Sequence, residues 1–179
     1  MACRVFLFGC VNFMHFISVI NDAQIHSVVT LAEEIWREHY TPIIGAAQVD
    51  YMLERYQSLD SIRRQISIDR FHYYLMVSGE NPTLGYFSVQ LQDDELFLSK
   101  IYVRASERGN GYGREALAFI EKMAGAGQLK KIVLTVNKNN HVAIGAYQRM
   151  GFEIEKPVVQ DIGNGFVMDD FQLTKMVNS

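Results

Sequence analysis

The chain contains 179 residues, 49% of them hydrophobic and 21% charged, and it carries a formal net charge of −3 at pH 7. This length and composition predict one globular domain with a substantial core, and they exclude a disordered tail or linker. The mild acidity, with no basic run longer than Lys130-Lys131, indicates no nucleic-acid-binding surface. Because the sequence has no uninterrupted run of about 18 apolar residues, it predicts no membrane span.

The beginning of the chain is apolar and holds both cysteines, Cys3 and Cys10. Its apolar core, 5–8, is shorter than the roughly 7 to 15 residues of a secretory signal, so we expect a cytoplasmic protein. Two cysteines provide neither a disulfide framework nor a metal site, and we therefore expect no metal. We expect residues 1–13 to be an extension outside the domain, which would occupy residues 14–179.

Hydrophobic periodicity and turn residues predict a chain of alternating helices and strands. Asn21-Asp22 caps a first helix whose apolar residues share one face, and short apolar runs bounded by Gly, Asn, Asp or Pro indicate strands. The predicted elements are a strand at 16–20, a helix at 23–39, a break at 41–45, one interrupted or two short helices at 49–59 and 61–69, strands at 71–78, 84–92 and 95–103, a helix at 114–123, a strand at 131–136, a helix at 140–150, and strands at 152–159 and 166–176.

A glycine-rich segment, Arg108-Gly109-Asn110-Gly111-Tyr112-Gly113, lies between a predicted strand and a predicted helix. Glycine permits positive φ and a close approach of the backbone to a ligand, and a helix N-terminus offers unpaired N–H groups to an anion. From Lys100 to Arg114 the chain has four basic residues against only Glu107. This segment therefore predicts a phosphate-binding loop.

The spacing of the glycines distinguishes between kinds of phosphate loop. A dinucleotide fingerprint would need a small residue where Arg114 stands and an acidic residue near Lys130-Lys131, and a P-loop would need a Gly-Lys pair that is absent. The pattern Arg108-x-x-Gly111-x-Gly113 instead resembles the coenzyme A pyrophosphate loop of the GNAT superfamily of N-acetyltransferases.

A second motif follows at 140–152, where the sequence has the pattern N-x-x-A-x-x-x-Y-x-x-x-G-F. Asn140, Ala143 and Tyr147 share one helical face, and Gly151 is suited to end the helix. This motif resembles the helix after the fifth strand of the same superfamily, and the two motifs occur in the order that the superfamily has.

The resemblance implies a single mixed α/β (α+β) domain. Its central, mostly antiparallel sheet would have six to seven strands, splayed between the fourth and fifth, with four flanking helices. It further implies that acetyl-CoA is the cosubstrate, with Asn140 beside the coenzyme or a water and Tyr147 near the thioester sulfur. The remaining coenzyme contacts that it implies are the backbone of Ile101, Tyr102 and Val103 for the pantetheine arm and Arg108, Gly109, Asn110, Gly111, Tyr112 and Gly113 for the pyrophosphate.

The chemistry predicted from these residues is direct transfer of acetyl to a primary amine, without a covalent enzyme intermediate. A tyrosine stays protonated at neutral pH and can donate a proton to a departing thiolate, so Tyr147 is the predicted general acid. Glu95 is the first candidate for the general base, with Glu34 and Asp94 behind it. A chain of waters is the alternative.

The identity of the acceptor is left open by the sequence. A small polyamine-like molecule is favoured by a looser resemblance of 34–59 and of Asp169-Asp170 to bacterial polyamine acetyltransferases, and a protein amine is the alternative. Trp36 and Tyr40 are candidates for the wall of the acceptor pocket, although core packing is the simpler role for Trp36. A non-catalytic acyl-CoA sensor with the same fold also remains open, as does a homodimer.

Overall fold

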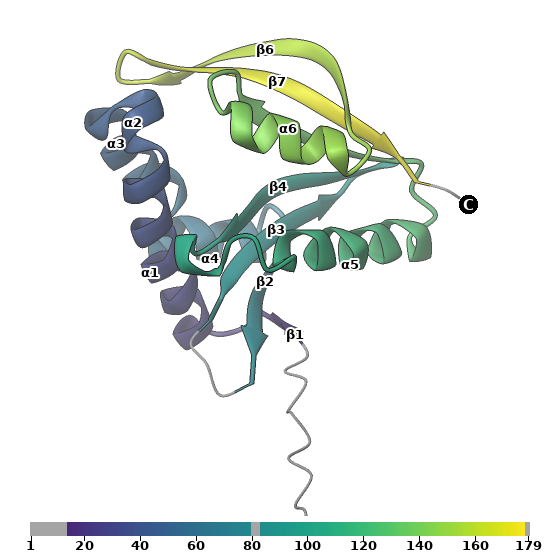
Figure 1. Ribbon diagram of the computed structural model, residues 1–179. Helices are drawn as coiled ribbons and strands as arrows, with labels where there is room; N and C mark the ends of the chain where they lie inside the picture. The colour runs from purple at the N-terminus through teal and green to yellow at the C-terminus, as the bar shows by residue number, and fades with distance from the viewer. Residues whose placement is uncertain (1–13, 80–82, 178–179) are drawn as a thin grey trace, which may run out of the picture.

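The protein is described by a computed structural model covering residues 14–79 and 83–177, so the extension expected at 1–13 lies outside the described residues (Figure 1). Its centre is a sheet of seven strands in the order β1-β2-β3-β4-β5-β7-β6. The strands are β1 (Met14–Ser18), β2 (Phe71–Ser78), β3 (Gly85–Leu91), β4 (Glu95–Val103), β5 (Lys131–Asn137), β6 (Glu153–Gly163) and β7 (Phe166–Met176). The helices are α1 (Asp22–His39), α2 (Thr41–Ile44), α3 (Ala46–Tyr56), α4 (Leu59–Ser67), α5 (Tyr112–Ala126) and α6 (His141–Arg149).

Helices cover both faces of the sheet, and each face has its own buried cluster. Leu117 and Ile120 of α5 pack with α6 and with the strands on one face. Val28 and Leu31 of α1 pack with α3, α4 and the opposite face of β2 and β3. Figure 1 shows α5 and α6 in front of the sheet and α1 to α4 along its left side. Each fully buried leucine or isoleucine contributes about 1.5 to 3 kcal/mol.

The sheet is antiparallel except where β4 runs parallel to β5. This parallel pairing is short, because it joins only Glu95, Leu96 and Phe97 to residues 131–133. Beyond Phe97 the two strands separate while each stays paired to its other neighbour, so both present an unpaired backbone edge. The expected splay between the fourth and fifth strands is confirmed.

A β-bulge in β4 changes which face of the sheet its side chains meet. Leu98 and Lys100 pair with consecutive residues of β3, so Ser99 is an extra residue. Leu98 belongs to the cluster under α5, whereas Tyr102, which shares the parity of Leu98 and Lys100, packs in the cluster under α1. The bulge therefore turns Lys100 and Tyr102 toward the side of the sheet that α1 to α4 cover.

The predicted mixed fold is confirmed, and the strands at 71–78, 95–103 and 166–176 have the predicted bounds. The helix count differs, because the described residues form six α-helices rather than four. The expected break at 41–45 contains the short helix α2, which has proline in its first turn. The segment 49–69 is divided between α3 and α4, because Ser58 caps a new helix by accepting a hydrogen bond from the Ser61 N–H.

Candidate active site

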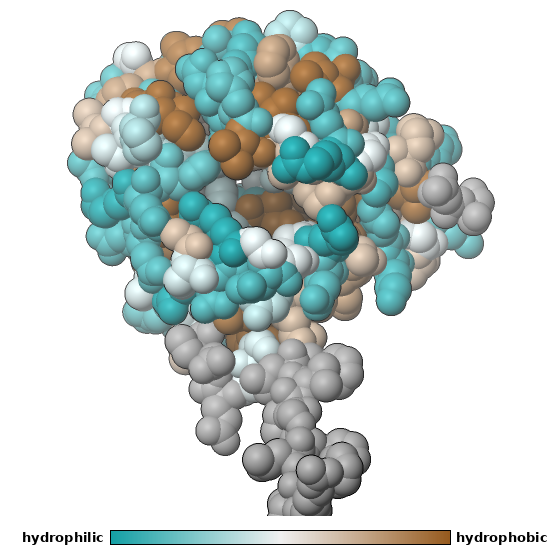
Figure 2. Space-filling model, in the orientation of Figure 1, coloured by the Kyte–Doolittle hydropathy of each residue, from teal (hydrophilic) through white to brown (hydrophobic). Residues whose placement is uncertain are grey.

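The separation of β4 from β5 opens a cavity of about 250 Å³, called here the smaller cavity. Its walls are the ends of β4 and β5, the C-terminal end of α1 and one face of α6. Ile101, Tyr102 and Val103, predicted to offer backbone groups to the pantetheine arm, line it together with Arg108 and Asn140. Figure 2 shows the surface hollowed over β4, between α1 and α6, with hydrophobic residues at the floor.

The glycine loop has the backbone geometry of an anion cradle. Gly109 and Gly111 adopt φ of +87° and +90°, which side chains rarely tolerate, and no atom lies within 4 Å of a Cβ built on either. Gly111 is the N-cap of α5, a helix of 15 residues, and no side chain caps its first N–H groups. These residues fit a pyrophosphate, since a helix start without a side-chain cap faces open space.

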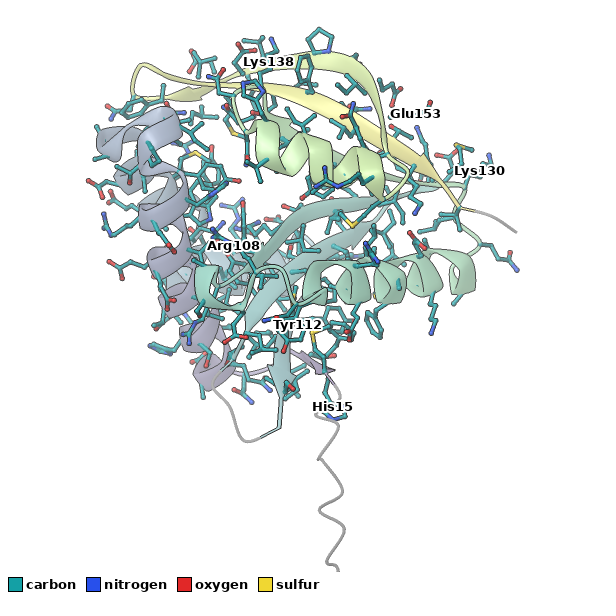
Figure 3. All side chains as sticks on the ribbon, in the orientation of Figure 1. His15, Arg108, Tyr112, Lys130, Lys138 and Glu153 are labelled. Carbon is teal, nitrogen blue, oxygen red and sulfur yellow. The ribbon has the colours of Figure 1, made fainter. Side chains whose placement is uncertain are left out.

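The other predicted loop residues have contacts within the protein. Arg108 Nε donates to the Val103 carbonyl at 3.1 Å and holds the loop against the end of β4, and Asn110 Nδ2 donates to the Glu107 carbonyl at 3.3 Å within the turn that follows β4. Tyr112 packs partly buried against the core under α5, and Gly113 has no positive φ. Figure 3 shows Arg108 and Tyr112 on either side of the loop.

Helix α6 brings Asn140 and Tyr147 to the wall of the smaller cavity. Asn140 is the N-cap: its Oδ1 accepts a hydrogen bond from the Ala143 N–H, and its Nδ2 lies 3.0 Å from His39 Nε2. Tyr147 packs edge-on against Phe152. Burial, and to a smaller extent Tyr40, raise the pKa of Tyr147, so its hydroxyl stays protonated at neutral pH.

A larger cavity of about 800 Å³ adjoins the smaller one. It lies between the helices α1 to α4 and the strands β4 to β7, and its walls include Trp36 and Tyr40, as predicted for the acceptor pocket. Trp36 is also a buried core residue of the cluster under α1. The two cavities share the residues Tyr40, Ser99, Lys100, Tyr102, Thr135 and Val136.

Two buried charged side chains face the larger cavity, and the sequence analysis assigned a role to neither. Asp170 on β7 is 5% exposed, and burial together with the charge of Asp169 raises its pKa to about 6. Burial, and to a smaller extent the charge of Asp170, raise the pKa of Tyr40, and Tyr40 in turn raises the pKa of Tyr147. Lys100 is 9% exposed, and burial lowers its pKa to about 8.

The carboxylates predicted as general bases are elsewhere in the fold. Glu95 pairs with Lys131 at 3.0 Å, Glu34 with Arg104, and Asp94 with Lys130, and none of the three lines either cavity. Glu95 begins β4, so it lies about 20 Å along the strand from Ile101. The structure therefore does not bring Glu95 to Tyr147.

One histidine that no sequence motif singles out reaches the site. His39, at the end of α1, lines the smaller cavity. Burial, and then the charge of Arg108, lower the pKa of His39, so the ring is neutral near pH 7. An asparagine amide nitrogen only donates, so Nε2 accepts from Asn140 and the ring proton lies on Nδ1. No local sequence signal pairs residues so far apart.

None of the helices within 14–79 and 83–177 is long and apolar enough to cross a membrane. In the same ranges, no group of three or more His, Cys, Asp and Glu side chains is arranged to hold a metal ion.

A sheet that opens between two parallel strands, beside a glycine loop that begins a helix, defines a coenzyme A-dependent acyltransferase. The acetyltransferase (GNAT) family model matches residues 28–152, more than half of the chain, and the chain belongs to this family. The protein is thus an N-acetyltransferase that uses acetyl-CoA as cosubstrate.

Solved acetyltransferase structures share this fold at low sequence identity. The PaiA N-acetyltransferase of Thermoplasma acidophilum, solved with coenzyme A, is 15% identical with a TM-score of 0.77, covering 92% of this chain and 99% of that one. The ribosomal-protein-S18-alanine N-acetyltransferase of Escherichia coli is 14% identical with a TM-score of 0.69, covering 93% and 96%. The spermidine N-acetyltransferase of Vibrio cholerae, solved with coenzyme A and spermine, is 15% identical with a TM-score of 0.65, covering 92% and 95%.

A comparison of sequences alone found a relative whose name is not that of an acetyltransferase. The chain is 26% identical over 139 residues to a protein of Staphylococcus haemolyticus called peptidyl-tRNA hydrolase. The alignment covers 66% of this chain and 73% of that protein.

Proposed function

We propose that the protein moves the acetyl group of acetyl-CoA to a primary amine, with Tyr147 as general acid and Asp170 as general base. The observation that carries this proposal is the wall shared by the two cavities. A coenzyme bound along the split edge of β4 and an acceptor in the larger cavity would meet there, between Tyr147 on one side and Asp170 on the other. Positioning two reactants in this way supplies much of the rate enhancement of a transfer reaction.

The residues that would hold the coenzyme are those predicted from the sequence. Ile101, Tyr102 and Val103 would offer the unpaired edge of β4 to the pantetheine arm, 108–113 would cradle the pyrophosphate, and Asn140 would lie beside the thioester end. When bound, acetyl-CoA supplies an activated acetyl group. The split edge can also direct N–H groups at a carbonyl oxygen that gains negative charge, which favours acyl transfer.

Tyr147 has the properties of a proton donor. Tyr147 lines the smaller cavity, and the raised pKa of its hydroxyl keeps it protonated. A departing thiol has a pKa near 8.5, so a tyrosine in contact with the sulfur can protonate it as the C–S bond breaks.

Asp170 has the properties of a proton acceptor. An ammonium group cannot attack a thioester, so the acceptor must lose a proton in the cavity. A carboxylate whose pKa is about 6 is a stronger base than an ordinary aspartate and is still ionised at neutral pH. In this proposal Asp170 replaces Glu95, which is paired with Lys131.

The decisive experiment is a thiol-release assay of the purified chain with acetyl-CoA and a panel of amines, including spermidine and a peptide with a free N-terminal alanine. We expect acetyl-CoA-dependent thiol release with at least one class of amine, and mass spectrometry should find the acetylated product. Tight acetyl-CoA binding without turnover on any amine would contradict the proposal and would favour the acyl-CoA sensor.

A further inference from the structure

The larger cavity contains opposite charges at separate places, and this bears on the acceptor that the proposed function leaves unidentified. Its wall includes the cationic side chains of Arg55, Arg64 and Lys100 and the carboxylates of Asp69 and Asp170. Lys100 and Asp170 are the two that are more than nine-tenths buried. A cavity meant only for a polycation would not need a buried cation in its wall, because like charges repel.

Lys100 is held in place without a counter-ion. Its Nζ donates to Gln65 Oε1 and to Ser99 Oγ, both at 3.1 Å, and lies over the rings of Phe71 and Tyr73. Among the described residues no carboxylate forms an ion pair with it, and the neutral contacts leave one of its three N–H donors available. Burying an ammonium group without an anion is costly, so this lysine is suited to receive an anion from a ligand.

The direction of the Lys100 side chain is fixed by the bulge at Ser99. Without this extra residue, Lys100 would share the face of Leu98 and enter the core under α5. With it, Nζ extends toward Gln65 on α4, which lines the larger cavity and not the smaller one. Lys100 lines both cavities, but the hydrogen bond to Gln65 directs its charged end toward the larger one.

The two buried charges are separated by the width of two strand spacings. β5 lies between β4, which carries Lys100, and β7, which carries Asp170, so their backbones are about 10 Å apart or more where the sheet splays. Asp170 lines only the larger cavity, and its charge acts on Tyr40, a residue of the shared wall, whereas the Lys100 ammonium is directed toward Gln65 on α4. An acceptor whose amine lies beside Asp170 and whose acidic group binds Lys100 would have several bonds between these two groups.

We propose that the acceptor is a small zwitterion, an amine that carries a carboxylate about six to eight atoms away, with the carboxylate bound by Lys100 and the amine beside Asp170. This inference rests on the proposed acetyl transfer and replaces the polyamine-like acceptor expected from the sequence. An ω-amino acid or the side chain of free lysine has this chemistry. Arg64, the neighbour of Gln65 on α4, also lines the larger cavity and adds positive charge to it.

The test compares amines that differ only in the remote group: 6-aminohexanoate, hexylamine, 1,6-diaminohexane and spermidine. We expect kcat/KM for 6-aminohexanoate to exceed that for hexylamine at least tenfold. The series from 4-aminobutanoate to 8-aminooctanoate should have an optimum at intermediate length. An aminoalkylphosphonate of the same length distinguishes a carboxylate site from a phosphate site, and its preference over the carboxylate would overturn the assignment of the anion.

The matched variant is Lys100→Met, which is unbranched and one atom shorter than lysine and removes the charge. We expect the preference for 6-aminohexanoate over hexylamine to fall at least tenfold in this variant. Calorimetric titration of 6-aminohexanoate into the protein saturated with coenzyme A gives a second readout that needs no turnover. Arg149→Met, at an exposed position of α6 that lines neither cavity, is the control for removing a cation.

The outcomes separate this inference from the proposed function. Equal use of 6-aminohexanoate and hexylamine, a preference for spermidine, or an unchanged preference in Lys100→Met would overturn the zwitterionic acceptor while leaving acetyl transfer intact. Preferential binding of 6-aminohexanoate that is lost in Lys100→Met, without turnover on any amine, would support the anion site and contradict the transfer. If Lys100→Met fails to fold, Lys100→Gln takes its place, and circular dichroism establishes the fold of each variant.

Discussion

The two cavities of this protein are adjacent but are built in different ways. The smaller cavity follows the split edge of β4 and the capped start of α6, and Arg108 connects it to the glycine loop before α5. The larger cavity is made from side chains of α1, α3, α4, β4, β5, β6 and β7, which approach one another only in the folded chain. Backbone sites depend on a few residues with local spacing, whereas side-chain sites depend on the whole fold.

This contrast suggests that the two cavities have different functions. A coenzyme that is the same for every member of a family can be held by a constant backbone frame, and specificity for the acceptor can then vary through single side chains. In this chain Lys100 and Asp170 line the larger cavity, whereas His39 and Arg108 line only the smaller one. Substitutions on the two sides should therefore alter different kinetic constants.

The largest effect is expected from Asp170→Asn. Removing the proposed base should lower kcat by about 10²-fold to 10³-fold at pH 7.5 and leave acetyl-CoA affinity unchanged. In the wild type, kcat should fall as the pH drops below about 6, because protonated Asp170 cannot accept a proton, and this limb should be absent from the variant. The loss should shrink above about pH 9, where more of the amine is already neutral.

Its matched control is Asp169→Asn, which changes the neighbouring carboxylate that pairs with Lys138 and is half exposed. We expect nearly normal kcat with the acid limb moved to lower pH, because Asp169 raises the pKa of Asp170 and Lys138 lowers it. Normal turnover in Asp170→Asn would move the role of base to His39 or to water. Pre-steady-state rates with saturating acceptor give the cleanest measurement.

The next largest effect is expected from Tyr147→Phe, which tests whether Tyr147 is the general acid. Turnover should fall by about 10²-fold while folding and coenzyme binding persist, and acyl donors with more acidic leaving thiols should recover part of the rate. Tyr74→Phe removes a partly buried hydroxyl that lines neither cavity, and it should behave like the wild type. Equal slowing of good and poor leaving groups would show that Tyr147 positions the reactants and donates no proton.

A smaller effect, confined to the coenzyme, is expected from Gly111→Val. A branched side chain at φ of +90° strains the loop and fills the space above α5, so acetyl-CoA affinity should drop at least tenfold, about 1.4 kcal/mol. Gly165→Val is the control for strain, because Gly165 has φ of +76° and open space around its Cβ position, in the turn between β6 and β7. Calorimetry that finds equal affinity for both folded variants would refute the cradle.

The last expected effect is on stability, and it has the opposite sign to the effect of the same variant on rate. Because the folded protein raises the pKa of Asp170 from 3.8 to about 6, its ionised form opposes folding above pH 6 and its protonated form does not below pH 4. Asp170→Asn should therefore raise the free energy of unfolding by about 1 to 3 kcal/mol at pH 8, with little change at pH 4. Urea denaturation at both pH values measures this, and an equal gain at both would contradict the burial argument.

The fold and the smaller cavity were largely predictable from sequence, because their signals are local. Gly111 and Gly113 follow Arg108 at fixed spacing, and Asn140 and Tyr147 share one helical face. The bulge at Ser99 has no such signal, since an extra residue in β4 is recognised only against its partners on β3. For the same reason Glu95 was a reasonable candidate by position, and its ion pair with Lys131 became visible only through the parallel pairing of β4 and β5.

Asp170 and Lys100 show which part of the candidate site could not be predicted from the sequence. Asp170 was noted only as part of an acidic pair, and Lys100 only as one of several basic residues near the glycine loop. Their burial depends on α1 to α4 covering one face of the sheet, and no short sequence window contains that information. A charged residue within an apolar strand, as Lys100 is between Leu98 and Tyr102, is the one local hint that could have singled it out.

The short junction between β4 and β5 also bears on how the protein unfolds. The sheet halves β1 to β4 and β5 to β7 share only the three residue pairs from Glu95–Lys131 to Phe97–Val133, so their backbone ladders can open as separate cooperative units. A coenzyme bound along both open edges would join these units, adding about 2.7 kcal/mol of stability at a hundredfold excess over its dissociation constant. Acetyl-CoA would then bridge β4 and β5 where the two strands are not paired. The resistance of the enzyme to unfolding would therefore increase with the cellular concentration of the coenzyme.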